Sequence, residues 1–185
     1  MLVLEPEVER ERLISDDYRR QQEELHKNPE YGIASISAAP IVSKVINTYG
    51  VEELLDYGAG KGNLAKHLKV EHPMRLQMYD PAIPKWSEKP DPAEMVACID
   101  VLEHIEPQLL ENVLDDLKRV TKRIGMFTVS CVPAEKTLSD GRNAHLIQAP
   151  CEWWLPKFME RFELHLFQRT ADGFFVLVMA RGIEH

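Results

Sequence analysis

The chain has 185 residues with a formal net charge of -8, and 44% of its residues are hydrophobic. This length and composition indicate one globular domain with a buried core, and the acidic balance disfavours a large nucleic-acid groove. The three cysteines have no CxxC spacing, which argues against a disulfide framework or zinc cluster and favours a reducing, cytoplasmic compartment. The N-terminus does not resemble a signal peptide, and no stretch approaches the ~20 apolar residues of a membrane span.

The N-terminal part of the chain is polar and offers few core positions. Ser15 can cap a helix over residues 16–26, in which the few apolar side chains share one face. We therefore expect residues 1–38 to form a helical arm or lid across a second, larger unit at residues 39–185.

From residue 39 onward, helical and strand patterns alternate. Apolar residues at helical spacing predict helices over residues 39–50, 62–72, 110–120 and 151–162. Short apolar runs predict strands at residues 53–57, 75–80, 94–99 and 125–130, and two further strands flank the turn signal Asp172-Gly173. This order predicts an α/β fold, with a Rossmann-like, mostly parallel sheet, helices on both faces and a C-terminal antiparallel hairpin.

The stretch LLDYGAGKGNL, residues 54–64, places three glycines at alternate positions directly after the first predicted strand. Ligands of open α/β sheets bind beyond the carboxyl ends of the strands, where glycines allow close backbone approach. A turn without a ligand is the alternative. A dinucleotide motif needs a small residue where Asn63 stands, and a P-loop needs Ser or Thr directly after Lys61. The spacing therefore favours a ligand without phosphates.

Three motifs in this order resemble class I S-adenosylmethionine-dependent methyltransferases of the small-molecule type: LLDYGAGKGNL, LQMYDPAIP and MVACIDVLEHIEP. The resemblance covers residues 39–182 and implies S-adenosylmethionine as the cofactor. One departure lies at residues 81–94, which are too few for the helix and strand that the family usually has there, so we expect the third strand to be missing. Trp86 then either covers the adenine edge or packs over the shortened edge of the sheet.

The resemblance also implies roles for individual residues. Gly58, Ala59 and Gly60 are expected along the methionine part of the cofactor, and Asp56 at its amino group. Asp80 is expected to accept hydrogen bonds from the ribose hydroxyls, which agrees with the usual role of an acid that ends the second strand; a simple turn before Pro81 is the alternative. The other expected cofactor contacts are Pro81, Ile83, Ile99 and Asp100.

Two histidines are the catalytic candidates, because a hydroxyl acceptor needs a base and histidine suits neutral pH. His104 follows the fourth strand of the family pattern, and His145 lies in a long loop after the fifth. Packing or helix capping is the alternative for His104. Substrate contacts are expected from the arm and the long loop, where core packing or turn formation are the alternatives: Tyr18, Tyr31, Arg142, Asn143 and Trp154. No His, Asp or Glu cluster has clear metal-ligand spacing, so the sequence predicts no metal site.

Together, these features favour a cytoplasmic S-adenosylmethionine-dependent methyltransferase that acts on a small molecule or glycan-like metabolite, at oxygen. The sequence lacks the [DN]-P-P-[YF] and Pro-Cys signatures of DNA methylation after the fourth strand, so neither a nucleic-acid nor a membrane partner is expected. The oligomeric state is not predicted. Two alternatives remain open: a module that holds the cofactor without catalysis, and an NAD(P)-dependent oxidoreductase, which Gly62 and Asn63 disfavour.

Overall fold

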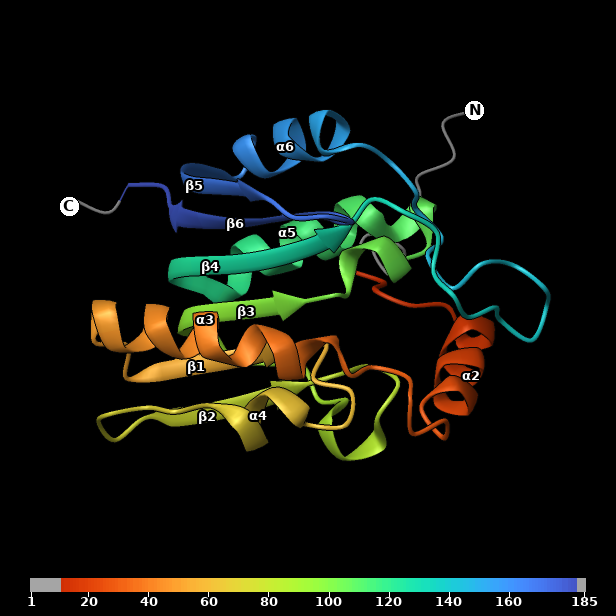
Figure 1. The fold of residues 1–185 in the computed structure, drawn as a ribbon, viewed down its shortest axis with the longest axis horizontal. Helices are drawn as coiled ribbons and strands as arrows, with labels where there is room; N and C mark the ends of the chain where they lie inside the picture. The colour runs from red at the N-terminus through yellow and green to blue at the C-terminus, as the bar shows by residue number, and fades with distance from the viewer. Residues whose placement is uncertain (1–10, 183–185) are drawn as a thin grey trace, which may run out of the picture.

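A six-stranded sheet with the order β2-β1-β3-β4-β6-β5 forms the centre of the molecule (Figure 1). The structure is a computed structural model that describes residues 11–182. Its strands are β1 Glu53–Tyr57, β2 Arg75–Tyr79, β3 Ala93–Ile99, β4 Thr121–Ser130, β5 Phe162–Arg169 and β6 Gly173–Ala180. The strands β1 to β4 pair in parallel, whereas β6 is antiparallel to both β4 and β5. The predicted fold class is confirmed.

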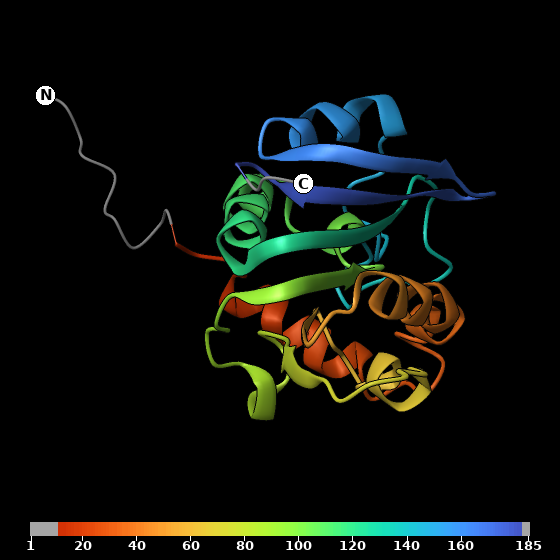
Figure 2. The ribbon, with the colours of Figure 1, turned by 90° about the vertical axis from the view of Figure 1, so that its left-hand side faces the viewer.

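Helices cover both faces of this sheet (Figure 2). The described helices are α2 Asp16–Leu25, α3 Ala34–Tyr49, α4 Asn63–His67, α5 Leu110–Val120 and α6 Cys151–Met159, with short 3-10 turns η1 Pro84–Trp86, η2 Leu102–His104 and η3 Pro107–Leu109. Apolar residues of α3 and α4 form one core with the sheet, and those of α5 and α6 form a second core with it. Strand β3 contributes to both cores and is buried on both faces, as its continuous apolar run predicts.

The largest differences from the predicted helix lengths occur in α3 and α4. Helix α3 begins at Ala34 rather than at residue 39, so the residues before Pro40 are already helical. It therefore runs across the expected boundary between arm and larger unit. Helix α4 ends at His67 instead of residue 72. The chain beyond it is held extended by α3, since the amide of Lys69 donates to Ser43 Oγ and its carbonyl accepts from Asn47 Nδ2.

The segment between β2 and β3 contains η1 and no strand, so the third strand of the family pattern is missing, as predicted. This makes β2 an edge of the sheet. Trp86, which ends η1, packs against the glycine-rich turn: one of its ring carbons lies 3.0 Å from the place where a Cβ on Gly62 would be.

The parallel strands all point in one direction, and the described part of the expected arm that precedes α3 crosses their C-terminal ends (Figure 1). This part, residues 11–33, is called the arm below; residues 1–10 of the expected arm lie outside the described residues. Ser15 caps α2 as predicted, with its Oγ accepting a hydrogen bond from the Tyr18 amide at 3.2 Å. The same residue anchors the arm, because its amide and hydroxyl both donate to the buried Glu106 carboxylate, at 2.8 and 2.7 Å. No helix among residues 11–182 has the length and apolarity needed to cross a membrane.

Candidate functional site

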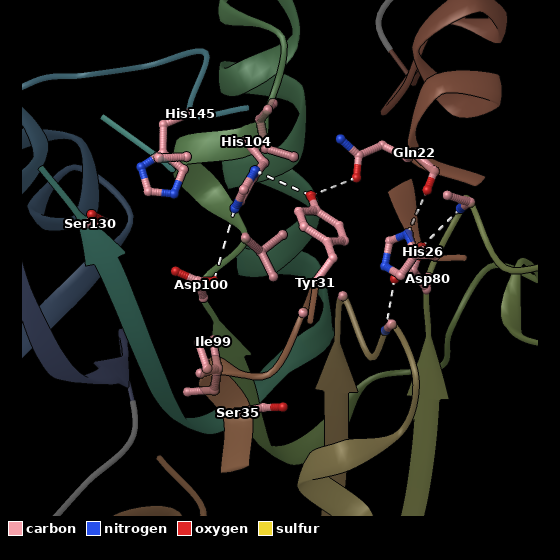
Figure 3. Close-up of a pocket in the computed structure, with 18 of the residues that line it drawn as sticks. Gln22, His26, Tyr31, Ser35, Asp80, Ile99, Asp100, His104, Ser130 and His145 are labelled. Carbon is pink, nitrogen blue, oxygen red and sulfur yellow. Dashed lines mark hydrogen bonds and ion pairs between the residues drawn. The ribbon is translucent and has the colours of Figure 1, made fainter. Parts of the chain in front are cut away.

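A cavity of about 690 Å³ lies beyond the C-terminal ends of the parallel strands, between these strands and the arm (Figure 3). Its volume falls in the range typical of small-molecule sites, about 300–1,000 Å³. The lining comes from the ends of β1, β2 and β3, from the arm, and from the loop that follows β4. One cavity therefore joins the two regions that the sequence singled out separately, the glycine loop (residues 58–62) and the two histidines.

The glycine loop needs its glycines for geometric reasons. Gly58 has a φ of +82°, and a Cβ added to it would lie 2.4 Å from Cγ2 of Val101. The amides of Gly58 and Ala59 both donate to the Tyr79 carbonyl, at 2.8 and 2.9 Å, which folds the loop back toward β2. Gly60 also has a positive φ, of +50°. The loop thus forms a cradle in which backbone rather than side chains faces the cavity.

Asp56, the residue before the end of β1, carries a carboxylate oxygen without a partner among the described residues. Its side chain is buried, and among the described residues its Oδ2 atom has no hydrogen-bond partner. Burial, with a smaller contribution from the Asp80 carboxylate, raises the pKa of Asp56 to about 7. A buried, unpaired carboxylate at a cavity wall suits a cationic ligand group. It therefore fits the ammonium of the methionine part of S-adenosylmethionine, as the sequence motif implied.

Asp80 stands at the end of β2, next to Asp56 across the glycine loop. Its Oδ2 accepts from the Gly60 amide at 2.8 Å, and its Oδ1 accepts from the Ala82 amide at 2.9 Å. Each carboxylate oxygen can accept more than one hydrogen bond, so both remain available to vicinal hydroxyls. Asp80 consequently has two tasks: it holds the loop in shape and presents acceptors to the cavity.

The remaining residues expected at the cofactor fall into two groups. Those that line the cavity together with Asp56 and Asp80 are Gly58, Ala59, Gly60, Pro81, Ile99 and Asp100. Ile83 is not among the lining residues, whereas its neighbour Ala82 is. Trp86 also does not line it, so its packing against Gly62 favours the role of cover over the shortened sheet edge.

His104 and His145 meet at the other end of the cavity, although 41 positions separate them in the chain. Their ring centroids lie 4.7 Å apart. His104 Nε2 lies 4.0 Å from Asp100 Oδ2 (Figure 3). Burial is the main cause that lowers the pKa of His104, to about 4, so the imidazole is neutral near pH 7. Asp100 has a φ of 58°, the one positive value of a non-glycine residue in the described chain.

A chain of hydrogen bonds connects the arm to this end of the cavity. Tyr31 donates to Gln22 Oε1 at 2.9 Å and lies 3.5 Å from His104 Nδ1 (Figure 3). Gln22 in turn donates to the Tyr18 hydroxyl at 2.7 Å, and that hydroxyl donates to the His104 carbonyl. Burial raises the pKa of both tyrosines above its usual value, so both hydroxyls stay protonated. Both tyrosines line the cavity, and their contact with a substrate stays a prediction.

Gln22 and His26 are among the lining residues of the arm that sequence reasoning missed. Gln22 lies four positions after Tyr18 and so shares its helix face, which is a signal that the sequence did contain. His26 lies over the glycine loop, where its Nε2 would be 3.2 Å from a Cβ on Gly60. Lys61 Nζ fixes this arrangement by donating to the carbonyls of Asn28 and Tyr31.

Three residues expected at the substrate do not line the cavity. Arg142 is exposed and pairs with Asp140, at 2.7 Å. Asn143 staples its own loop, because its side chain bonds both the amide and the carbonyl of Ala134, at 2.9 and 2.8 Å. Trp154 is fully buried in the hydrophobic core that α5 and α6 form with the sheet, where it stacks on Phe158. Their predicted contact with a substrate has no support from this geometry.

Comparisons with known proteins were made by sequence and by structure. A family model described as "Methyltransferase domain" matches residues 9–171. A search of curated proteins by sequence found no match.

Three solved structures illustrate the structural likeness. The chain is similar to the 1,6-didemethyltoxoflavin-N1-methyltransferase of Burkholderia thailandensis, solved with S-adenosylhomocysteine, at 15% identity and a TM-score of 0.62, covering 91% of this chain and 92% of that one. It is similar to the N-methyltransferase NodS of Bradyrhizobium japonicum at 12% identity and a TM-score of 0.57, covering 90% of this chain and 100% of that one. It is also similar to the mitomycin 7-O-methyltransferase MmcR at 12% identity and a TM-score of 0.63, covering 88% of this chain and 60% of that one. At these identities the likeness establishes the fold.

Proposed function

Because the chain belongs to the methyltransferase-domain family, we propose that it transfers a methyl group from S-adenosylmethionine to an oxygen atom of a small molecule. The observation that carries this proposal is the single cavity, which joins a glycine cradle with two carboxylates to a pair of histidines. When bound, S-adenosylmethionine supplies a methyl group that its sulfonium already activates.

At one end of the cavity, the protein provides the groups that such a cofactor needs. The unpaired Asp56 carboxylate receives the ammonium, and the backbone of Gly58 and Ala59 lies along the methionine chain. Asp80 receives the ribose hydroxyls while it keeps the loop closed through Gly60. These groups orient the reactive methyl toward the histidine end, and alignment of this kind is a large part of the catalytic work in methyl transfer.

At the other end, the side chains favour a hydroxyl acceptor. His104 and His145 each donate Nδ1–H to a backbone carbonyl, at 2.8 and 2.6 Å, which leaves an acceptor lone pair on each Nε2. An acceptor hydroxyl can donate to these nitrogens and to the Asp100 carboxylate. The depressed pKa of His104 makes it a weak base, so in this proposal it acts mainly by orienting the hydroxyl.

The size and position of the cavity favour a small molecule as the acceptor. Residues of the arm form one wall of the cavity, and the net charge of -8 disfavours nucleic acid. The solved neighbours include both N- and O-methyltransferases. We propose oxygen as the methyl acceptor because the hydrogen-bond acceptors around the site suit a hydroxyl group.

Calorimetry tests the cofactor assignment. S-adenosylmethionine and its demethylated product should bind, and NADH should not. Asp80→Asn should weaken binding by about 1–3 kcal/mol, or roughly 5- to 150-fold, since it removes a charged acceptor. The control Asp91→Asn changes an exposed acid away from the cavity and should bind normally. Tight NADH binding without binding of the methyl donor would favour the oxidoreductase alternative and refute the proposal.

Incorporation of labelled methyl groups tests catalysis. The protein is incubated with labelled S-adenosylmethionine and a fractionated cell extract. The label should enter the small-molecule fraction, remain there in dilute acid and be released by a reagent that cleaves methyl ethers. Label in protein or nucleic acid would contradict the small-molecule assignment. Normal cofactor binding without any transfer would leave the alternative of a cofactor-holding module.

A further inference from the structure

The structure gathers Asp100, His104 and His145 into one group that no sequence spacing revealed. One ligand atom from each residue can be chosen so that all three atoms lie within 4.8 Å of one another. Metal–nitrogen and metal–oxygen distances are ~2.0–2.2 Å, so ligand atoms around one ion stand about 3–4.4 Å apart. The group therefore lies within a small side-chain adjustment of a coordination site.

The hydrogen bonds of the two histidines prepare them for this role. His104 Nδ1 bonds the Ala144 carbonyl at 2.8 Å, and His145 Nδ1 bonds the Val132 carbonyl at 2.6 Å. A carbonyl can only accept, so both rings carry a proton on Nδ1, and in the neutral ring Nε2 is the nitrogen with the free lone pair. Histidines that bind metals almost always donate their other ring N–H to a carbonyl or carboxylate in this manner.

A second, independent observation is the buried carboxylate of Glu103. This side chain is fully buried, and its Oε2 has no hydrogen-bond partner among the described residues, while its Oε1 accepts from the Ser130 amide. A fully buried carboxyl group with an unpartnered oxygen is costly to the fold. A cation bound beside it would offset that cost.

We propose that Asp100, His104 and His145 bind one divalent transition-metal ion, with the Glu103 carboxylate behind them. Two imidazoles and one carboxylate suit Mn²⁺, Fe²⁺, Co²⁺, Ni²⁺ or Zn²⁺ better than Mg²⁺ or Ca²⁺, which prefer oxygen ligands. All three residues line the cavity, so the remaining coordination positions face the space in which the methyl acceptor would lie. Ion binding needs only these residues, whereas the ion's catalytic role rests on the proposed function.

In that role, the ion holds the acceptor oxygen and lowers the pKa of its hydroxyl. The hydroxyl proton passes to water, the new O–C bond forms as the C–S bond breaks, and the sulfur keeps the electron pair of the broken bond. The charge that develops on the oxygen is then balanced by the ion.

Binding is tested without any substrate. The full chain, stripped with a chelator, is titrated with Co²⁺ by visible absorption and with Zn²⁺ by calorimetry. We expect one ion per chain and the d–d bands of a nitrogen- and oxygen-coordinated Co²⁺. Asp100→Asn and His145→Ala should each weaken binding by at least about 10-fold, since even residues that only support a ligand contribute 10- to 100-fold. The control His67→Ala changes an exposed histidine of α4 and should bind normally.

Asn tolerates the positive φ of position 100, so Asp100→Asn tests the site even if His145→Ala fails to fold. The absence of one-to-one binding, or equal binding by Asp100→Asn and the parent, would overturn the proposal. So would loss of binding in His67→Ala alone.

The catalytic role is tested by labelled methyl transfer before and after metal removal. We expect transfer to fall at least 10-fold in the stripped protein and to return with Mn²⁺ or Co²⁺. Full transfer by the stripped protein would refute the role of the ion. If no transfer occurs under any condition while Co²⁺ binds, the proposed function fails and the metal site stands.

Discussion

Asp56 is the residue whose ionisation in the folded chain has the free-energy cost that is easiest to measure. Its pKa is raised to about 7 from an ordinary value of 3.8, so between these two pH values the folded chain holds a proton that the unfolded chain has lost. The free energy of unfolding therefore falls as pH rises from about 4 to 7, by up to ~4 kcal/mol from this group, and above pH 7 this cost stays constant.

Asp56→Asn removes this titration. Relative to the parent, the variant should gain stability between pH 5 and pH 8 in urea denaturation, while its affinity for S-adenosylmethionine should fall. In the parent, affinity should rise with pH up to about 7, because the ammonium of the cofactor pairs with the ionised form. A stability difference between variant and parent that does not change with pH would show that Asp56 ionises normally.

Gly58 is the residue at which the backbone leaves least freedom. Gly58→Ala should destabilise the protein by more than ~1 kcal/mol, because an alanine at a φ of +82° is strained and its Cβ would meet Val101. Adding Val101→Ala should relieve the clash and leave the strain, so the double variant should recover part of the loss in thermal denaturation. Full recovery would show that the turn tolerates a side chain.

At the scale of elements, Lys61 holds the segment of the arm that follows α2. Lys61 Nζ bonds the carbonyls of Asn28 and Tyr31, so Lys61→Met should free this segment. We expect faster amide hydrogen exchange at residues 26–33, with little change in the sheet. The control Lys44→Met alters an exposed position of α3 and should leave exchange in the arm unchanged. Unchanged exchange in Lys61→Met would mean that Ser15 and Glu106 hold the arm by themselves.

The elements themselves were largely predictable because their signals are local. The run ELLDY is strand β1 over its full length, and the apolar stripe of residues 110–120 is helix α5. The early end of α4 was not predictable, since it depends on Ser43 and Asn47, more than twenty positions away. The expected domain boundary at residue 38 falls inside α3, and the division of the chain there stays a prediction.

The site shows the same limit more strongly. Its cofactor end lies in motifs that follow single strands, so Asp56, Asp80 and the glycines could be proposed from the sequence. Its other end forms only when the loop after β4 folds back and brings His145 to His104. Arg142 and Trp154 had equally suggestive chemistry, yet one pairs with Asp140 and the other fills the core. Side-chain direction in a long loop cannot be read from composition.

At the scale of the whole molecule, the cofactor should act as a stabiliser. A ligand that binds only the folded state at 100 times its dissociation constant adds about 2.7 kcal/mol to the free energy of unfolding. For a chain of this size, that corresponds to a rise in Tm of about 5–11 °C. S-adenosylhomocysteine should produce this shift in thermal denaturation and NADH should not. An equal shift with both would show that binding does not depend on the features of the glycine loop.

The bond from Lys61 to the arm also has a consequence for time. The residue belongs to the loop that we propose to hold the cofactor, yet it also bonds the segment of the arm that lines the same cavity. A ligand held between loop and arm must part from both before it leaves. The lifetime of the spent cofactor on the protein is thus set partly by how often a lysine releases two carbonyls, and turnover can be limited by this release even where the methyl transfer itself is fast.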